Sequence, residues 1–229
     1  MRIKDYIIKK VIFEVRYFPL LSFSSKNFNG LQKFTKEFTR FDVQDRLIEL
    51  SNDENYKKLL VSWNKLAFTT ENVKSLDEAN RQINKYCLSV LDDLKVDYYL
   101  RTGLRVMYLI PTDSTFEELI EYYEKIINFD ADAFNGFGNI VDIGTLALTL
   151  SKEKSKANLS CGPMKDEEVN KKVAEFRNYK NELDSYLFID YDIYTEESLP
   201  LKGYIEKSIN ESRLSIVRFR DKLQEKFND

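Results

Sequence analysis

Alternating apolar and polar residues predict a β-strand over residues 7–18. One face of this strand is apolar throughout, and the other carries the charged residues Glu14 and Arg16 beside Ile12. The apolar face consists of Val11, Phe13, Val15 and Tyr17. The pattern is typical of a strand that covers a core on one side and meets polar surroundings on the other.

The same alternation returns twice later in the chain. A strand predicted from about Val96 to Pro111 places Arg101, Gly103 and Arg105 on one face. Its opposite face is apolar and contains Leu104, Val106, Tyr108 and Ile110. A third strand, from Ser185 to Tyr194, carries Asp190 and Asp192 two residues apart and therefore on one side.

Other segments carry apolar residues at helical spacing. Capping boxes at Ser75–Glu78 and Thr115–Glu118 predict helices over about 75–94 and 115–128. Helices are also expected over 28–40, 166–180 and 199–227, and further extended segments near 43–50, 57–70, 140–151 and 155–161. The last helix is the longest, with an apolar stripe formed by Ile205, Ile209, Ile216, Phe219, Leu223 and Phe227.

The order of these elements suggests an internal duplication. It is β-α-β-β-α over residues 1–95 and β-α-β-β-(α)-β-α over residues 96–229, with no Pro-rich or Gly-rich linker between the halves. We therefore expect an α+β fold in which pseudo-duplicated units form an antiparallel sheet with helices packed on one face. The chain is expected to be one pseudo-symmetric body over residues 1–229.

The amino-acid composition excludes several kinds of catalytic and metal-binding site. The 229 residues include no His, which excludes Ser-His-Asp triads, Cys-His dyads and His-ligated zinc. Only two Cys are present, so a reducing, cytoplasmic location is expected. No apolar run reaches the ~20 residues that a membrane span needs, and no membrane association is expected.

Charge is distributed unevenly although the net charge is only -3. Residues 1–40 contain nine basic and three acidic side chains, whereas the middle of the chain is acidic. The basic segment could serve an acidic partner or nucleic acid. The favoured interpretation is that it packs beside the acidic middle of the same domain, because no run of five or six like charges occurs.

Six charged residues form the candidate binding site. Glu14 and Arg16, Arg101 and Arg105, and Asp190 and Asp192 each share one face of their strand. If the three strands are close together, these acidic and basic groups face one another across the sheet. The group could bind a polar ligand or partner, or it could consist of cross-strand ion pairs worth roughly 0.2–1 kcal/mol each on a solvated face, which is the favoured interpretation.

Asp190 and Asp192 also suggest an alternative chemistry. Hard cations such as Mg²⁺ or Mn²⁺ need oxygen ligands, and Glu14 or Asp142 could supply a third one. The enzyme expected from such a site is a metal-dependent phosphodiesterase or nuclease with Asp190, Asp192 and Glu14 as catalytic residues. No accompanying motif supports it. The sequences at Asp130–Gly136, Gly136–Gly138 and Ser151–Lys154 resemble calcium, dinucleotide and Ser-Lys motifs but lack their required residues or setting.

Four stretches together resemble a sporadically distributed, uncharacterised prokaryotic protein family. They are Val11–Tyr17 with its Glu-x-Arg pattern, Leu59–Leu66, Leu100–Tyr108 with Arg-x-Gly-Leu-Arg, and Leu187–Tyr194 with Asp-x-Asp before a long helix. The resemblance spans nearly the whole chain and implies a fold and an order of elements, not an activity. The chain differs from the family's pattern in having Lys9 and Lys10 where a Pro is common, and in having no His in the terminal helix.

These observations favour a non-enzymatic binding or interaction protein. One expected role is as a component of a multi-gene prokaryotic system such as phage defence. A protein partner is expected, or a homo-oligomer formed through the apolar stripe of the last helix. Nucleic-acid binding through Arg16, Arg101, Arg105 and the basic first forty residues is a less favoured alternative, because the sequence pI is 5.4.

Overall fold

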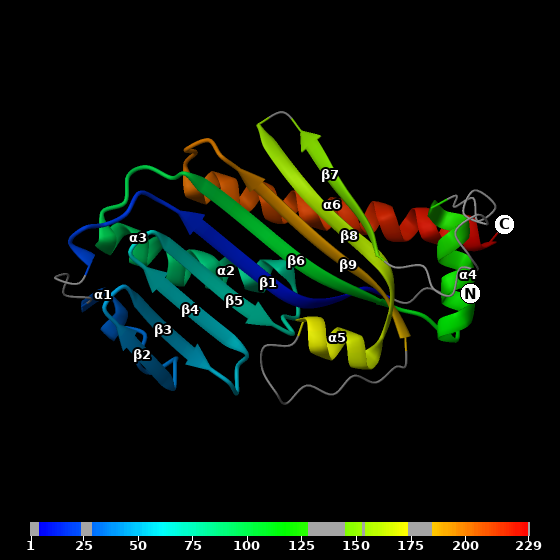
Figure 1. Ribbon diagram of the computed structural model, residues 1–229, viewed down its shortest axis with the longest axis horizontal. Helices are drawn as coiled ribbons and strands as arrows, with labels where there is room; N and C mark the ends of the chain where they lie inside the picture. The colour runs from blue at the N-terminus through cyan, green and yellow to red at the C-terminus, as the bar shows by residue number, and fades with distance from the viewer. Residues whose placement is uncertain (1–4, 24–28, 128–144, 153, 174–184, 229) are drawn as a thin grey trace, which may run out of the picture.

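The computed structural model describes residues 5–23, 29–127, 145–152, 154–173 and 185–228, and these contain one nine-stranded sheet (Figure 1). Every neighbouring pair of strands is antiparallel. The α+β class and the antiparallel sheet predicted from the sequence are confirmed. The strands are β1 (Ile7–Arg16), β2 (Arg40–Gln44), β3 (Leu47–Asn52), β4 (Lys57–Ser62), β5 (Lys65–Glu71), β6 (Arg101–Pro111), β7 (Leu146–Lys152), β8 (Ser155–Lys165) and β9 (Ser185–Thr195).

The strand order is β2-β3-β4-β5-β1-β6-β9-β8-β7. Strands β1 and β6 therefore pair at the centre. After β1 the chain crosses to the β2 edge and returns strand by strand to β5, which pairs with β1. After β6 it crosses to the β7 edge and returns through β8 to β9, which pairs with β6. Both halves thus follow the same path within a single sheet.

The first half contains more strands than the sequence pattern predicted. The two extended segments expected near 43–50 and 57–70 are each divided by a two-residue turn, at Asp45–Arg46 and at Trp63–Asn64. Neither turn contains Gly or Pro, the residues that most often mark a turn in a sequence. The prediction of two strands here was wrong because these turns carry no such signal.

The helices are α1 (Asn29–Gln32), α2 (Leu76–Ile83), the π-helix η2 (Asn84–Leu88), α3 (Ser89–Leu94), α4 (Phe116–Ile127), α5 (Asp166–Val173) and α6 (Leu201–Asn228). Both predicted N-caps form, and the capping box is reciprocal at Thr115, whereas the Glu78 carboxylate accepts from the backbone N–H of Lys74 and not of Ser75. The Ser75 and Thr115 hydroxyls accept hydrogen bonds from the backbone N–H groups of Glu78 and Glu118. The helix expected over 28–40 is only four residues long and continues as turns, although its apolar Leu31, Phe34 and Phe38 are buried as the spacing implied.

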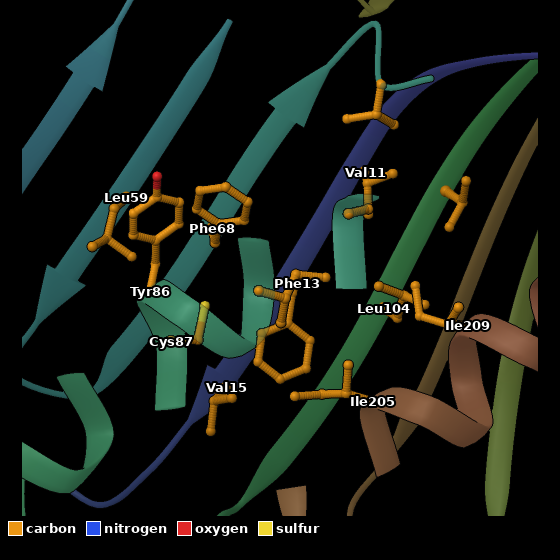
Figure 2. Close-up of a cluster of buried hydrophobic side chains, with 14 of the residues drawn as sticks. Val11, Phe13, Val15, Leu59, Phe68, Tyr86, Cys87, Leu104, Ile205 and Ile209 are labelled. Carbon is orange, nitrogen blue, oxygen red and sulfur yellow. The ribbon is translucent and has the colours of Figure 1, made fainter. Parts of the chain in front are cut away.

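One face of the sheet, the helix-covered face, carries most of the core. Val11, Phe13 and Val15 of β1 are fully buried there. Figure 2 shows them beside Leu104 of β6, with Cys87 of η2 and with Ile205 and Ile209 of α6 nearby. This single cluster includes residues of both halves, which is why the chain folds around one core.

The opposite face, called here the open face, is covered at one end. Helix α5 packs there through Val169, which joins a second buried cluster with Met107, Leu109, Met164, Tyr186 and Phe188. The expectation that all helices lie on one face therefore fails for α5. The alternation within β6 explains it, because Met107 and Leu109 continue the face of Arg101 and Arg105 and need an apolar cover.

The apolar stripe of α6 is used within the chain. Ile205, Ile209, Ile216 and Leu223 are at most 3 % exposed and belong to the main core. These four side chains cover the sheet of their own chain, and the expected protein partner or homo-oligomer stays a prediction. Among the described residues, no helix has the length and apolar character needed to cross a membrane.

Candidate functional site

The six predicted site residues share the open face on three adjacent strands. β1, β6 and β9 are neighbours, and their register places Glu14 opposite Gly103 and Arg105 opposite Asp192. Directly opposed residues in antiparallel strands point to the same side. The acidic and basic groups therefore face one another across the sheet, as the sequence pattern predicted for adjacent strands.

Ion pairs join the six residues in two groups, a series from Arg16 through Glu14 and Arg101 to Asp192 and a separate pair of Arg105 with Asp190. Arg16 donates from Nε to Oε1 of Glu14 at 2.7 Å, and Nη1 of Arg101 lies 3.7 Å from the same oxygen. Arg101 donates from Nη2 to Oδ2 of Asp192 at 3.2 Å. Arg105 holds Asp190 with two hydrogen bonds, Nε to Oδ1 at 2.7 Å and Nη2 to Oδ2 at 2.5 Å. A bidentate guanidinium–carboxylate pair of this kind is the strongest and most directional in the group.

Two further residues of the network were not predicted. Lys65 of β5 lies opposite Arg16 and places its Nζ 3.7 Å from Oε2 of Glu14. The ring of Tyr194 lies beneath the Arg101 guanidinium, with 4.3 Å between the ring centroid and Cζ. Tyr194 continues the i, i+2 series of Asp190 and Asp192, so alternation alone could have included it. Lys65 could be found only with the knowledge that β5 pairs with β1.

Gly103 is the residue of β6 next to this stacked pair. It lies between Arg101 and Arg105 on β6, opposite Tyr194 on β9. A Cβ atom at this position would lie 3.4 Å from Cβ of Tyr194 and 3.6 Å from Oδ1 of Asp192, which is ordinary contact. A methyl group would therefore fit, whereas a branched side chain would crowd both neighbours.

Half of the predicted residues line a hollow on the open face. Arg105, Asp190 and Asp192 border a space of about 530 Å³ that extends over β8 and β7. Its polar lining from those strands is neutral and consists of Thr149, Asn158 and Ser160. Glu14, Arg16 and Arg101 lie outside it. The sequence did not point to the neutral residues, because Thr, Asn and Ser on a strand are common on any solvated face.

Three basic side chains of the site are more exposed to solvent than its carboxylates. The side chains of Arg16, Arg105 and Lys65 are 52 %, 43 % and 37 % exposed. The carboxylates lie lower: Glu14 and Asp192 are 23 % exposed, and Asp190 is 9 % exposed. These three cations therefore form the outer layer of the site, whereas Arg101, 25 % exposed, lies level with the carboxylates Glu14 and Asp192.

The fold shifts the pKa of two residues of the site, Asp192 and Arg105. Burial raises the pKa of Asp192 above its usual value, although Arg101 and Arg105 act in the opposite direction. The hydrogen bonds with Asp190 raise the pKa of Arg105. Asp192 is thus a carboxyl whose charge costs free energy in the fold, while Arg105 is held charged.

The carboxylates are poorly arranged for a metal ion. Both oxygens of Asp190 accept hydrogen bonds from Arg105, and a cation would have to displace that positive charge. In the part of the chain that the structure describes, three or more His, Cys, Asp or Glu side chains do not gather into a metal-binding group. Asp142, the other suggested oxygen ligand, lies outside the described residues, as do the segments Asp130–Gly136 and Gly136–Gly138.

A second polar cluster lies on the other side of the sheet, at the π-helix. Oε2 of Glu37 accepts hydrogen bonds from Nζ of Lys85 and from the Tyr86 hydroxyl, each at 2.6 Å. Nζ of Lys57 donates to the Tyr86 hydroxyl at 3.0 Å and lies 5.1 Å from the centroid of the Phe38 ring. Burial alone would raise the pKa of Glu37, but its hydrogen bonds with Lys85 and Tyr86 lower it overall. The cluster ties the turn after α1 to η2 and β4.

Comparisons with protein-family models and with curated proteins find no match for this chain. The family resemblance therefore stays a prediction.

Proposed function

We propose that this protein is a binding protein that acts without catalysis and takes an acidic polypeptide segment on its open face. The observation that carries the proposal is the layering of charge, with Arg16, Arg105 and Lys65 outermost and the carboxylates beneath them. An approaching anionic group meets guanidinium and ammonium groups first. Electrostatic complementarity of this kind speeds encounter and selects the partner.

Arg16 and Arg105 have more N–H donors than their described hydrogen bonds use. A guanidinium carries five N–H groups in a planar fork. The described hydrogen bonds of Arg105 use its Nε and Nη2 atoms, and that of Arg16 uses Nε. A partner carboxylate can therefore bind at the outer edge of either guanidinium while the existing pair keeps the side chain oriented. Pre-oriented side chains lose less entropy on binding.

A polypeptide suits the site better than nucleic acid does. Acidic and basic groups alternate across β1, β6 and β9, and a segment that mixes carboxylates with hydroxyl or amide donors can match both signs. A uniform polyanion meets Glu14 and Asp192 as well as the arginines. The ring of Tyr194, which would otherwise offer a platform for a base, is already stacked against Arg101.

Metal-dependent phosphodiester cleavage with Asp190, Asp192 and Glu14 has weaker support, because Arg105 holds both oxygens of Asp190. A place in a multi-gene prokaryotic system stays a prediction. A cytoplasmic location also stays a prediction.

Fluorescence anisotropy with a labelled peptide of alternating Glu and Ser tests the proposal. We expect saturable binding that weakens as salt screens the contacts. A double variant, Arg16→Gln with Lys65→Gln, should bind about fivefold more weakly or worse, equivalent to about 1 kcal/mol. The matched control removes one Arg and one Lys from the exposed surface of α6, Arg218→Gln with Lys202→Gln, and should bind as wild type does.

Three outcomes would overturn the proposal. Equal losses in the double variant and its control would assign the binding to net charge alone. Tighter binding of single-stranded DNA than of the peptide would favour nucleic acid. Turnover of a phosphodiester substrate with Mg²⁺ or Mn²⁺ that is lost in Asp190→Asn would make the protein an enzyme.

A further inference from the structure

The outer edge of β7 is unprotected in the part of the chain that the structure describes. β7 pairs with β8 on one side, and residues 146–151 are exposed on both faces of the strand. None of these six residues is charged, and Leu146, Leu148 and Leu150 are 37 %, 41 % and 40 % exposed. Only the last residue of the strand, Lys152, is charged, and a long edge strand with so little charge readily pairs with another strand.

The opposite edge of the sheet is different. β2 is five residues long and carries Arg40 and Asp42, and Arg40 is paired with Asp53 at 2.9 Å. Short edge strands with charged side chains resist pairing with other chains. The two edges of one sheet therefore differ in their tendency to associate, and β7 is the edge that lacks protection.

We propose that two copies of this chain pair antiparallel through β7, with the two-fold axis at Leu148. In this register Leu148 faces the partner's Leu148, and Leu146 faces the partner's Leu150. Each leucine of the row thus lies against a leucine, on one side of a sheet that continues from one copy into the other. Self-pairing brings no like charges together, because residues 146–151 carry none.

A second copy is the occupant that the edge fits best. A two-fold interface must be self-complementary, and the Leu-x-Leu-x-Leu spacing meets that condition about its own centre. The same strand supplies Ala147 and Thr149 to the hollow on the open face, so the partner's β7 would extend the floor of each hollow. The dimer does not depend on which molecule the open face binds.

The expected dimer is weak. Pairing of one seven-residue strand buries less than the ~1,200 Å² that marks the low end of stable interfaces. We therefore expect association at micromolar concentrations and a monomer at high dilution. Light scattering across this range should show the mass rise from 27.1 kDa towards twice that value.

The test compares charges placed on the two edges. Leu148→Lys sets two lysines against each other at the axis and should weaken the dimer at least about tenfold. Val43→Lys places the same side chain at an exposed position of β2, where Val43 is 70 % exposed, and should dimerise as wild type does. Thermal melting of both variants verifies that each is folded.

Cross-linking reports the register. Native Cys87 and Cys161 are buried, so a Leu148→Cys variant adds an exposed thiol. Residues opposed in an antiparallel pair have Cα atoms about 4.5–5.5 Å apart, within disulfide reach. Mild oxidation should give a covalent dimer, and Val43→Cys should not. A monomer at ~200 µM would overturn the proposal, as would equal weakening by the two lysine variants or equal cross-linking of the two cysteine variants.

Discussion

The pair of Arg105 and Asp190 allows a quantitative test of how the site is held together. Asp190 is nearly buried, with 9 % of its side chain exposed, whereas Arg105 is 43 % exposed. Replacing Arg105 with Gln leaves a buried carboxylate without its bidentate partner. Replacing Asp190 with Asn instead leaves a guanidinium that water can reach. The two substitutions should therefore differ in cost although they break the same pair.

The expected loss in the free energy of unfolding lies between two limits. Breaking a buried pair by removing one partner costs about 3–5 kcal/mol, and exposed pairs are worth about 0.2–1 kcal/mol. With one partner buried and the other half-exposed, Arg105→Gln should lower the free energy of unfolding by about 2 kcal/mol and Asp190→Asn by about 1 kcal/mol. The double variant should reveal a coupling energy of about 1 kcal/mol. Arg16→Gln, at a more exposed pair, should cost about 0.5 kcal/mol or less.

Urea unfolding monitored by circular dichroism supplies these values, with the double-mutant cycle run at one pH and salt concentration. The asymmetry is the decisive result. If Asp190→Asn cost as much as Arg105→Gln, or if Arg105→Gln and Arg16→Gln were equal, burial of the Asp190 carboxylate would not control the energetics. The account of a buried acidic layer beneath exposed cations would then be wrong.

Three further predictions concern groups whose pKa the fold shifts. Burial lowers the pKa of Lys9 to about 7, so the unfolded chain holds more protons between pH 7 and about 10. The free energy of unfolding should rise across that range by up to about 1.4 kcal/mol per pH unit, and a Lys9→Met variant should lose the rise. Burial raises the pKa of Asp192, so this carboxyl favours folding at low pH and loses that contribution as pH rises through the folded-state pKa. Acidification from about pH 6 to about pH 3 should therefore stabilise an Asp192→Asn variant less, or destabilise it more, than wild type. Burial raises the pKa of both Cys87 and Cys161, so a thiol reagent should label them only as fast as the protein opens, and rapid labelling would contradict their burial.

Alternation predicted the strands that matter most for the site. The faces of β1, β6 and β9 were correct around the six charged residues, because there each strand alternates between a charged side and an apolar side. The same method missed the turns at Asp45–Arg46 and Trp63–Asn64, which lack Gly and Pro. It also missed the role of α5, because the sequence alone does not say which face of the sheet a short helix covers.

Only some of the contacts in the site could be predicted from the alternation of residues along each strand. Sharing a face is a local property, so the pairing of Glu14 with Arg16 could be expected from two residues alone. The contacts of Arg101 with Asp192 and of Lys65 with Glu14 depend on strand order, and they join residues far apart in the chain. The hollow depends on β7 and β8 as well, whose neutral side chains carry no chemical signature.

The central position of β1 has a consequence for how the chain emerges from the ribosome. β1 completes its pairing with β5 once Glu71 has been made, but its other neighbour, β6, ends about 40 residues later at Pro111. At about 5–20 residues per second, the second edge of β1 stays open for roughly 2–8 s. Its apolar face lacks the cover of α6 for longer still. Translation speed across residues 72–111 therefore sets how long the nascent first half can pair with the wrong strand.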